Sequence, residues 1–156
     1  MNNSFSHIGI VIFAFLLAAS SVALSQTPAP YQLQFPGDPA HSAAEASALG
    51  YMRVVLRAQR QYKTKHDHFA PSLPALAHTG TFTPRMARST DRGDYTVKFH
   101  SKKDGFSLAM IPKQYDDQHR AFYAEEDGVI RAEEGKPATA DSPKLKYLGS
   151  AATGDD

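Results

Sequence analysis

The residues in this sequence that could bind a metal ion are histidines and aspartates spread over several polar segments. They are His41, His66, Asp67, His68, His78, Asp116, Asp117 and His119. Imidazole nitrogens and carboxylate oxygens are ligands that zinc and related divalent ions accept. Two histidines separated by one residue in a loop have no fixed geometry, however, and the sequence contains no HExxH spacing. We therefore predict no metal site and no cofactor.

Nucleophilic catalysis requires a serine beside a base that an acid orients. The chain has no GxSxG motif, because Gly105 precedes Ser107 but no closing glycine follows. A calcium loop is equally incomplete, since Asp127 and Gly128 lack the alternating oxygen ligands around them. General acid–base catalysis by paired carboxylates stays open, although no pattern indicates a cleft. We predict that the protein has no catalytic residues and is not an enzyme.

Basic side chains form the candidate interaction surface. The stretch 51–120 carries an excess of Lys and Arg, whereas 121–156 carries an excess of Asp and Glu. Such asymmetry can steer a charged partner, but it also suits an ordinary solvated helix face. Nucleic acid is one possible partner of a basic patch. The candidate face consists of Arg53, Arg57, Arg60, Lys63 and Lys65.

The N-terminal segment is typical of export. Residues 1–25 carry no charged side chain, and residues 8–24 are almost wholly apolar, ending in Ala23-Leu24-Ser25. Small residues at these positions are typical of a signal-peptide cleavage site. The alternative is an uncleaved membrane anchor, because the apolar run is near the shortest length that spans a bilayer. We predict a signal peptide over 1–25 and a periplasmic or secreted protein. Its partner is then an envelope or secretion-system protein or an anionic glycan rather than nucleic acid.

The chain contains no cysteine, so an exported domain is held together by its core without disulfides. Prolines at four positions between Gln26 and His41 predict an extended linker over 26–41. Ser42 and Glu45 then match a capping box, and apolar residues at helical spacing predict a helix to about Lys65. Gln59 and Lys63 interrupt its apolar face, so we expect the last two turns to pack less deeply.

Beyond Pro71 and Pro74, which allow only a short helical turn, the period changes from helical to alternating. Four short strands joined by tight turns predict an antiparallel meander. One long amphipathic helix can cover its apolar face, which gives an α+β domain over 42–135. The tail 136–156 is polar and predicted to be flexible. The strands are predicted at 95–100, 106–112, 121–124 and 129–131.

The order of these elements, with particular residues at their joints, resembles the globular head of type IV pilin-like proteins and type II secretion pseudopilins. Residues 58–62 (AQRQY) resemble the family's helix end with an aromatic, and 69–76 (FAPSLPAL) its Ser-Leu turn. Residues 93–97 (GDYTV) are similar to the opening of its first strand. Residues 122–131 (FYAEEDGVIR) resemble its hairpin with Asp-Gly before an Ile-Arg pair. The resemblance covers about residues 42–135.

The N-terminus departs from that family. Pilins have a glutamate five residues into the hydrophobic helix, and here the apolar run after Gly9 contains none. The prolines of 26–41 also interrupt any continuous helix. We therefore expect a pilin-like head that is exported alone as a non-catalytic interaction module. The alternatives are a divergent minor pilin or pseudopilin, and a small metal-dependent enzyme.

Overall fold

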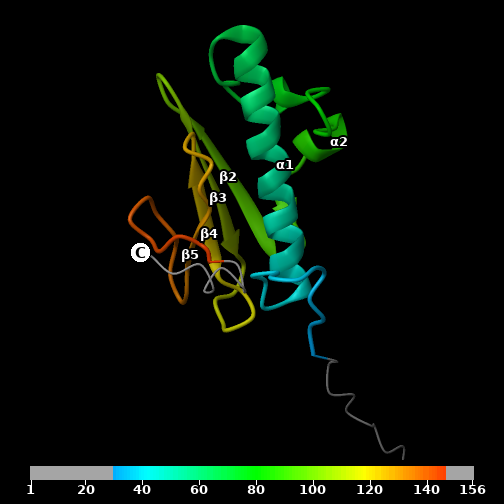
Figure 1. Cartoon of the computed structure of the whole chain (residues 1–156), viewed down its shortest axis with the longest axis vertical. Coiled ribbons are helices and arrows are strands. Elements are labelled where there is room, and N and C mark those ends of the chain that lie inside the picture. Colours follow the sequence, from blue (N-terminus) through cyan, green and yellow to red (C-terminus); the bar gives the residue numbers. More distant parts are fainter. Residues whose placement is uncertain (1–29, 147–156) are drawn as a thin grey trace, which may run out of the picture.

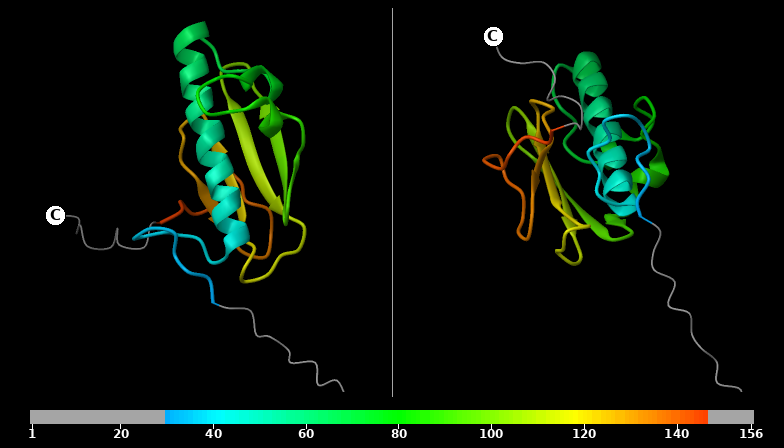
Figure 2. Two further views of the ribbon diagram at one scale, coloured as in Figure 1. Left: turned by 90° about the vertical axis from the view of Figure 1, so that its right-hand side faces the viewer. Right: turned by 60° about the horizontal axis from the view of Figure 1, so that its bottom comes forward.

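A single long helix lies across one face of an antiparallel sheet in the computed structural model (Figures 1 and 2). The structure describes residues 30–146 of the 156-residue chain. The helix α1 spans Ala43–His66. It is followed by η1 (Pro74–Leu76), α2 (Pro84–Ala87), β1 (Asp91–Arg92), β2 (Tyr95–Ser101), β3 (Phe106–Pro112), β4 (Ala121–Glu125) and β5 (Arg131–Glu133). The predicted α+β class is confirmed.

The sheet is a meander in which every strand pairs antiparallel with the next one along the chain. It has five strands rather than the predicted four. The additional strand, β1, was not predicted, because two residues are too few to reveal an alternating pattern. The last strand begins at Arg131 rather than Val129, because Asp127 Oδ1 accepts the Val129 N–H at 2.9 Å and holds the preceding residues in a turn.

The core lies between α1 and the sheet. Alternate residues of the strands face the helix, so that Val97 pairs with Met110 and Met110 with Phe122. All three of these side chains are buried, as are Leu49, Met52 and Val55 of α1. Burying side chains of this size stabilises a fold by roughly 1.5–3 kcal/mol each. The predicted helix–sheet arrangement therefore accounts for the hydrophobic core.

The last turns of α1 pack less deeply, as predicted, because no residue of the helix after Gln59 is buried. Gln59 itself is buried. Its Nε2 donates to the Ala70 carbonyl at 3.2 Å, and its Oε1 accepts the Ala70 N–H at 2.9 Å. Both ends of the amide are thus satisfied, which removes the cost of burying it. The pair of bonds fastens the segment before η1 to α1.

A buried ion pair fixes the start of α1. Ser42 Oγ accepts the Glu45 N–H at 3.1 Å, as the capping box predicts, but the Glu45 carboxylate reaches back to the His41 N–H at 2.8 Å rather than to Ser42. The same carboxylate accepts three bonds from Arg120, from its backbone N–H (2.8 Å), Nε (3.0 Å) and Nη2 (2.7 Å). Arg120 Nη2 also donates to the Pro39 carbonyl at 2.6 Å. The loop before α1 and the first turn of α1 are therefore joined to the segment before β4, which is distant in sequence.

The segments expected to be a linker and a tail are packed on the domain where the structure describes them. Within 30–41, Asp38, Pro39 and Ala40 are buried. Ala138 and Ser142 are also buried, although 136–156 was predicted to be flexible. The Leu145 N–H donates to the Ile130 carbonyl at 2.8 Å, which adds this segment to the edge of the sheet.

The predicted signal peptide, residues 1–25, lies outside the described residues, as do residues 26–29 of the linker and 147–156 of the tail. Within 30–146, no helix combines the length and the apolar character that crossing a bilayer requires. The prediction of an anchor or a cleaved signal therefore concerns the segment before residue 30.

Replacing Arg120 should destabilise the fold strongly. The Arg120→Ala variant leaves the Glu45 carboxylate buried without its cation, and such a loss costs about 3–5 kcal/mol. The Lys113→Ala variant is the matched control, because its ion pair with Asp91 is exposed on both sides and should cost about 1 kcal/mol at most. Urea unfolding followed by circular dichroism measures both, and equal costs would contradict the role given to Arg120.

Candidate functional site

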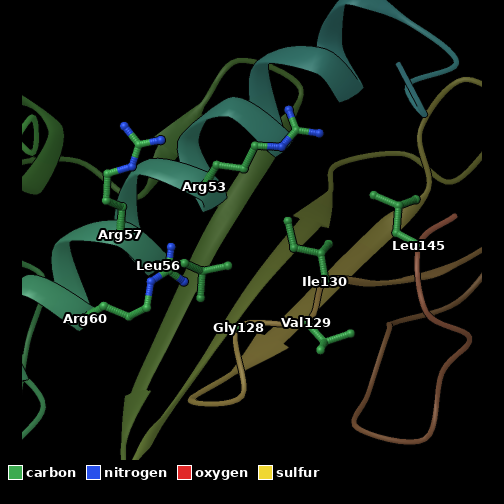
Figure 3. Close-up of a pocket in the computed structure, with 8 residues that line it drawn as sticks. All are labelled: Arg53, Leu56, Arg57, Arg60, Gly128, Val129, Ile130 and Leu145. Atoms are coloured by element: carbon green, nitrogen blue, oxygen red, sulfur yellow. The ribbon is translucent and has the colours of Figure 1, made fainter. Parts of the chain in front are cut away.

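Three of the five predicted basic residues line one groove. Arg53, Arg57 and Arg60 come from α1 and line a hollow whose other side is the turn between β4 and β5 (Figure 3). The hollow between them and that turn has a volume of about 380 Å³. We call it the arginine groove, and it is lined by Arg53, Leu56, Arg57, Arg60, Gly128, Val129, Ile130 and Leu145.

Lys63 and Lys65 are not part of this groove. The Lys63 ammonium lies 4.5 Å from the centre of the Phe69 ring, and the residue lines a separate hollow with Lys102 and Lys103. Lys65 is exposed, and at 3.6 residues per turn it lies about 120° around the helix from Arg53. The predicted basic face is therefore divided between different surfaces of α1.

Two of the arginines in the groove lack a counter-ion among the described residues. Arg57 and Arg60 are exposed, and within residues 30–146 neither guanidinium makes a hydrogen bond or an ion pair. Asp127 of the facing turn is already engaged, because its Oδ2 accepts from Arg131 Nη2 at 2.9 Å. Two cations therefore face the groove with no counter-ion supplied by the described chain.

Arg53 closes one end of the groove against the N-terminal loop. Its guanidinium lies 5.6 Å from the centre of the Phe35 ring, a cation–π contact. The loop itself is held by the buried Asp38, whose carboxylate accepts bonds from Tyr31 Oη at 2.5 Å and from the N–H groups of Gln34 and Ala40, each at 3.1 Å. This loop thus positions the Phe35 ring beside the first arginine.

Gly128 allows Arg60 to lie close to the turn between β4 and β5. Its φ of 74° is in the left-handed region, which glycine adopts without strain. A Cβ at this position would be 3.2 Å from Arg60 Nη1. The absence of a side chain therefore lets the guanidinium approach the backbone of the turn and narrow this end of the groove.

The far wall of the groove includes a residue that the sequence analysis missed. Leu145 lies in the segment predicted to be a flexible tail, yet it is held by its bond to Ile130, while the Ala132 N–H donates to the Pro143 carbonyl at 3.0 Å. The alternation of Pro143, Leu145 and Tyr147 with two lysines was a period-two signal for a strand. The signal was overlooked because the segment 136–156 is polar as a whole, which favoured a flexible tail.

The candidate metal ligands are distributed over different places. The rings of His66 and His68 are 6.1 Å apart and contact the Tyr62 ring, His66 in a tilted arrangement and His68 edge-on. His119 lies between Asp116 and Asp94 at the opposite end of the sheet. The hydrogen bond with the His119 ring lowers the pKa of Asp116. Within the described part of the chain, no group of three His, Asp or Glu side chains is arranged so that it could hold a metal ion.

Comparison with known proteins leaves the groove to be interpreted from its own residues. No family model, no curated protein and no solved structure matches this chain. What the groove offers chemically is a row of hydrogen-bond donors with positive charge beside an aliphatic surface.

The loop beside Arg53 should depend on pH through Asp38. Burial raises the pKa of this carboxyl, but the bonds from Tyr31, Gln34 and Ala40 outweigh it and lower the pKa below the ordinary 3.8. A lowered pKa in the folded state contributes stability above pH 3.8 that is lost as the pH falls through the folded-state pKa. Burial, the hydrogen bond and the charge of Asp38 raise the pKa of Tyr31 from 10.0 to about 12, so its contribution is present below pH 10 and lost as the pH approaches 12.

We expect the Asp38→Asn variant to be less stable than the wild type at pH 7, and this difference to shrink as the pH is lowered towards 2. Urea unfolding at several pH values measures this difference in stability.

The Tyr31→Phe variant should raise the pKa of Asp38, because it removes one of the three hydrogen-bond donors to the carboxylate. Carbon-13 NMR of the carboxyl group measures that pKa. An unchanged value would contradict the assigned bond.

Proposed function

We propose that this chain is an exported, non-catalytic binding module with a pilin-like head, which docks onto an anionic component of the cell envelope through the arginine groove. The observation that carries the proposal is the pair Arg57 and Arg60, which face a groove without a counter-ion from the described chain. Exposed guanidiniums without a counter-ion favour association with an anionic partner, because the partner supplies the missing negative charge.

The arrangement of the domain supports the pilin-like part of the proposal. A long helix precedes a short turn that contains η1, and an antiparallel meander follows, in the order that the resemblance implies. The Asp-Gly pair of the last hairpin has a structural reason, since Asp127 caps the turn and Gly128 has a positive φ. This hairpin turn is also one wall of the groove. Fold alone does not determine function, so the docking role depends on the groove.

A divergent minor pilin or pseudopilin is the second candidate, and the same order of elements favours it. The two candidates differ in how the N-terminus is processed. An exported module cleaved by signal peptidase would begin at Gln26, whereas a pilin-type chain cleaved after Gly9 would begin at Ile10 and keep its apolar segment.

N-terminal sequencing of the protein recovered from its own cells separates these candidates. We expect the mature chain to begin at Gln26, because Ala23 and Ser25 provide the small residues of a signal-peptide site. A chain beginning at Ile10 would favour the pilin role, and an intact Met1 would indicate an anchor.

Removing the two free cations should abolish docking. We expect the Arg57→Ala/Arg60→Ala variant to retain at least tenfold less of its envelope partner than the wild type in pull-downs from envelope fractions. The matched control is Arg85→Ala/Arg88→Ala, which removes two exposed guanidiniums near α2 and gives the same net charge. Exposed substitutions of this kind usually change stability by about 0.5 kcal/mol or less, so both variants should fold. Equal retention by all three proteins would refute docking through the groove.

A further inference from the structure

We propose that the arginine groove binds an extended acidic peptide in which carboxylate and aliphatic side chains alternate. This inference rests on the proposed function, because it names the partner chemistry of the same groove. The two walls of the groove differ, with arginines on α1 and aliphatic residues on the β4–β5 turn and the 143–145 segment (Figure 3). A ligand that fits must therefore present different chemistry to the two sides.

Every polar side chain that lines the groove is an arginine. A guanidinium provides five N–H donors and no acceptor. The ligand must then supply acceptors, and a carboxylate is the strongest match because it can accept two parallel bonds from one guanidinium. The charges of Arg57 and Arg60, which have no counter-ion within the described residues, favour more than one carboxylate.

The aliphatic wall argues against a sugar chain as the ligand. Val129, Ile130 and Leu145 offer neither a side-chain acceptor for hydroxyl groups nor an aromatic ring, and neither does Leu56 on the α1 side. A hydroxyl buried there without a partner would cost about 1–3 kcal/mol. Aliphatic side chains of a peptide gain free energy on the same surface, at roughly 25 cal/mol for each Å² removed from water.

The spacing of the arginines favours a peptide over a ligand with a single charged head. Along α1 the rise of about 1.5 Å per residue separates Arg53 from Arg57 by about 6 Å and from Arg60 by about 10.5 Å. In an extended strand, residues i and i+2 lie about 6.7 Å apart on the same side, while the residue between them points the opposite way. Acidic residues at alternate positions can thus face the arginines while the intervening aliphatic residues face Ile130 and Leu145.

The size of the groove sets the length of the segment. Its volume of about 380 Å³ is at the small end of ligand sites, which range from about 300 to 1,000 Å³. A second helix would need an axis about 8–10 Å from that of α1, and the facing hairpin turn occupies that side. The occupant is accordingly a short extended segment of a partner protein.

The test uses the full exported protein and an acetylated, amidated pentapeptide, Glu-Leu-Glu-Leu-Glu, in isothermal titration calorimetry. We expect binding that weakens as salt is raised and that falls at least tenfold in the Arg57→Ala/Arg60→Ala variant. The Arg85→Ala/Arg88→Ala control should bind as the wild type does. Two further peptides separate the contribution of the negative charge from that of the aliphatic side chains. In one of them glutamine replaces every glutamate, and in the other serine replaces every leucine. Each should bind at least fivefold more weakly than the first peptide.

The inference is overturned if the wild type does not bind the first peptide, or if the serine peptide binds as well as the leucine peptide, which would leave only a charge patch. It is also overturned if dodecanoate or a sulfated disaccharide binds the groove more tightly than the peptide. If envelope pull-downs still depend on Arg57 and Arg60 in any of these cases, the proposed function stands and only the peptide chemistry is wrong.

Discussion

The ion pair between Glu45 and Arg120 is the constraint on which the rest of the structure depends. The carboxylate is fully buried and accepts four hydrogen bonds, from the loop before α1, from the backbone before β4 and from the Arg120 side chain. Two charges removed from water are tolerated only when the geometry satisfies them this completely. The pair therefore determines where the first turn of α1 meets the sheet, and so which side of the helix faces the β4–β5 turn.

The position of the arginine groove follows from this constraint. The helix covers the sheet with the face that carries Leu49, Met52 and Val55, and the adjoining stripe of Arg53, Arg57 and Arg60 then lies beside the last hairpin. At the other end of α1, the bonds between Gln59 and Ala70 hold the chain that leads to η1. The groove is thus built on a helix fixed near both ends, which keeps its guanidiniums in position for a partner.

The sequence predicted those features that repeat along the chain. The capping box at Ser42, the helical spacing of α1 and the alternation in β2 and β3 are local patterns, and each led to the element that the structure contains. The short β1, the packed Asp38 loop and Leu145 were missed, because each depends on partners distant in sequence. The separation of Lys65 was predictable, since twelve residues at 100° each place it about 120° from Arg53. Lys63 is only three residues after Arg60, and its assignment to another hollow depends on contacts with Phe69 and with Lys102 and Lys103, which helical spacing does not reveal.

Leu145 gives the groove a thermodynamic link to the edge of the sheet. One wall exists only while residues 143–145 are paired with Ile130 and Ala132, and such peripheral pairing opens more readily than a core strand. A ligand that needs this wall binds only the closed population, so its apparent affinity scales with that population. Occupancy of the groove in turn protects the pairing of residues 143–145 against opening, and so keeps the edge of the last strand covered against pairing with other chains.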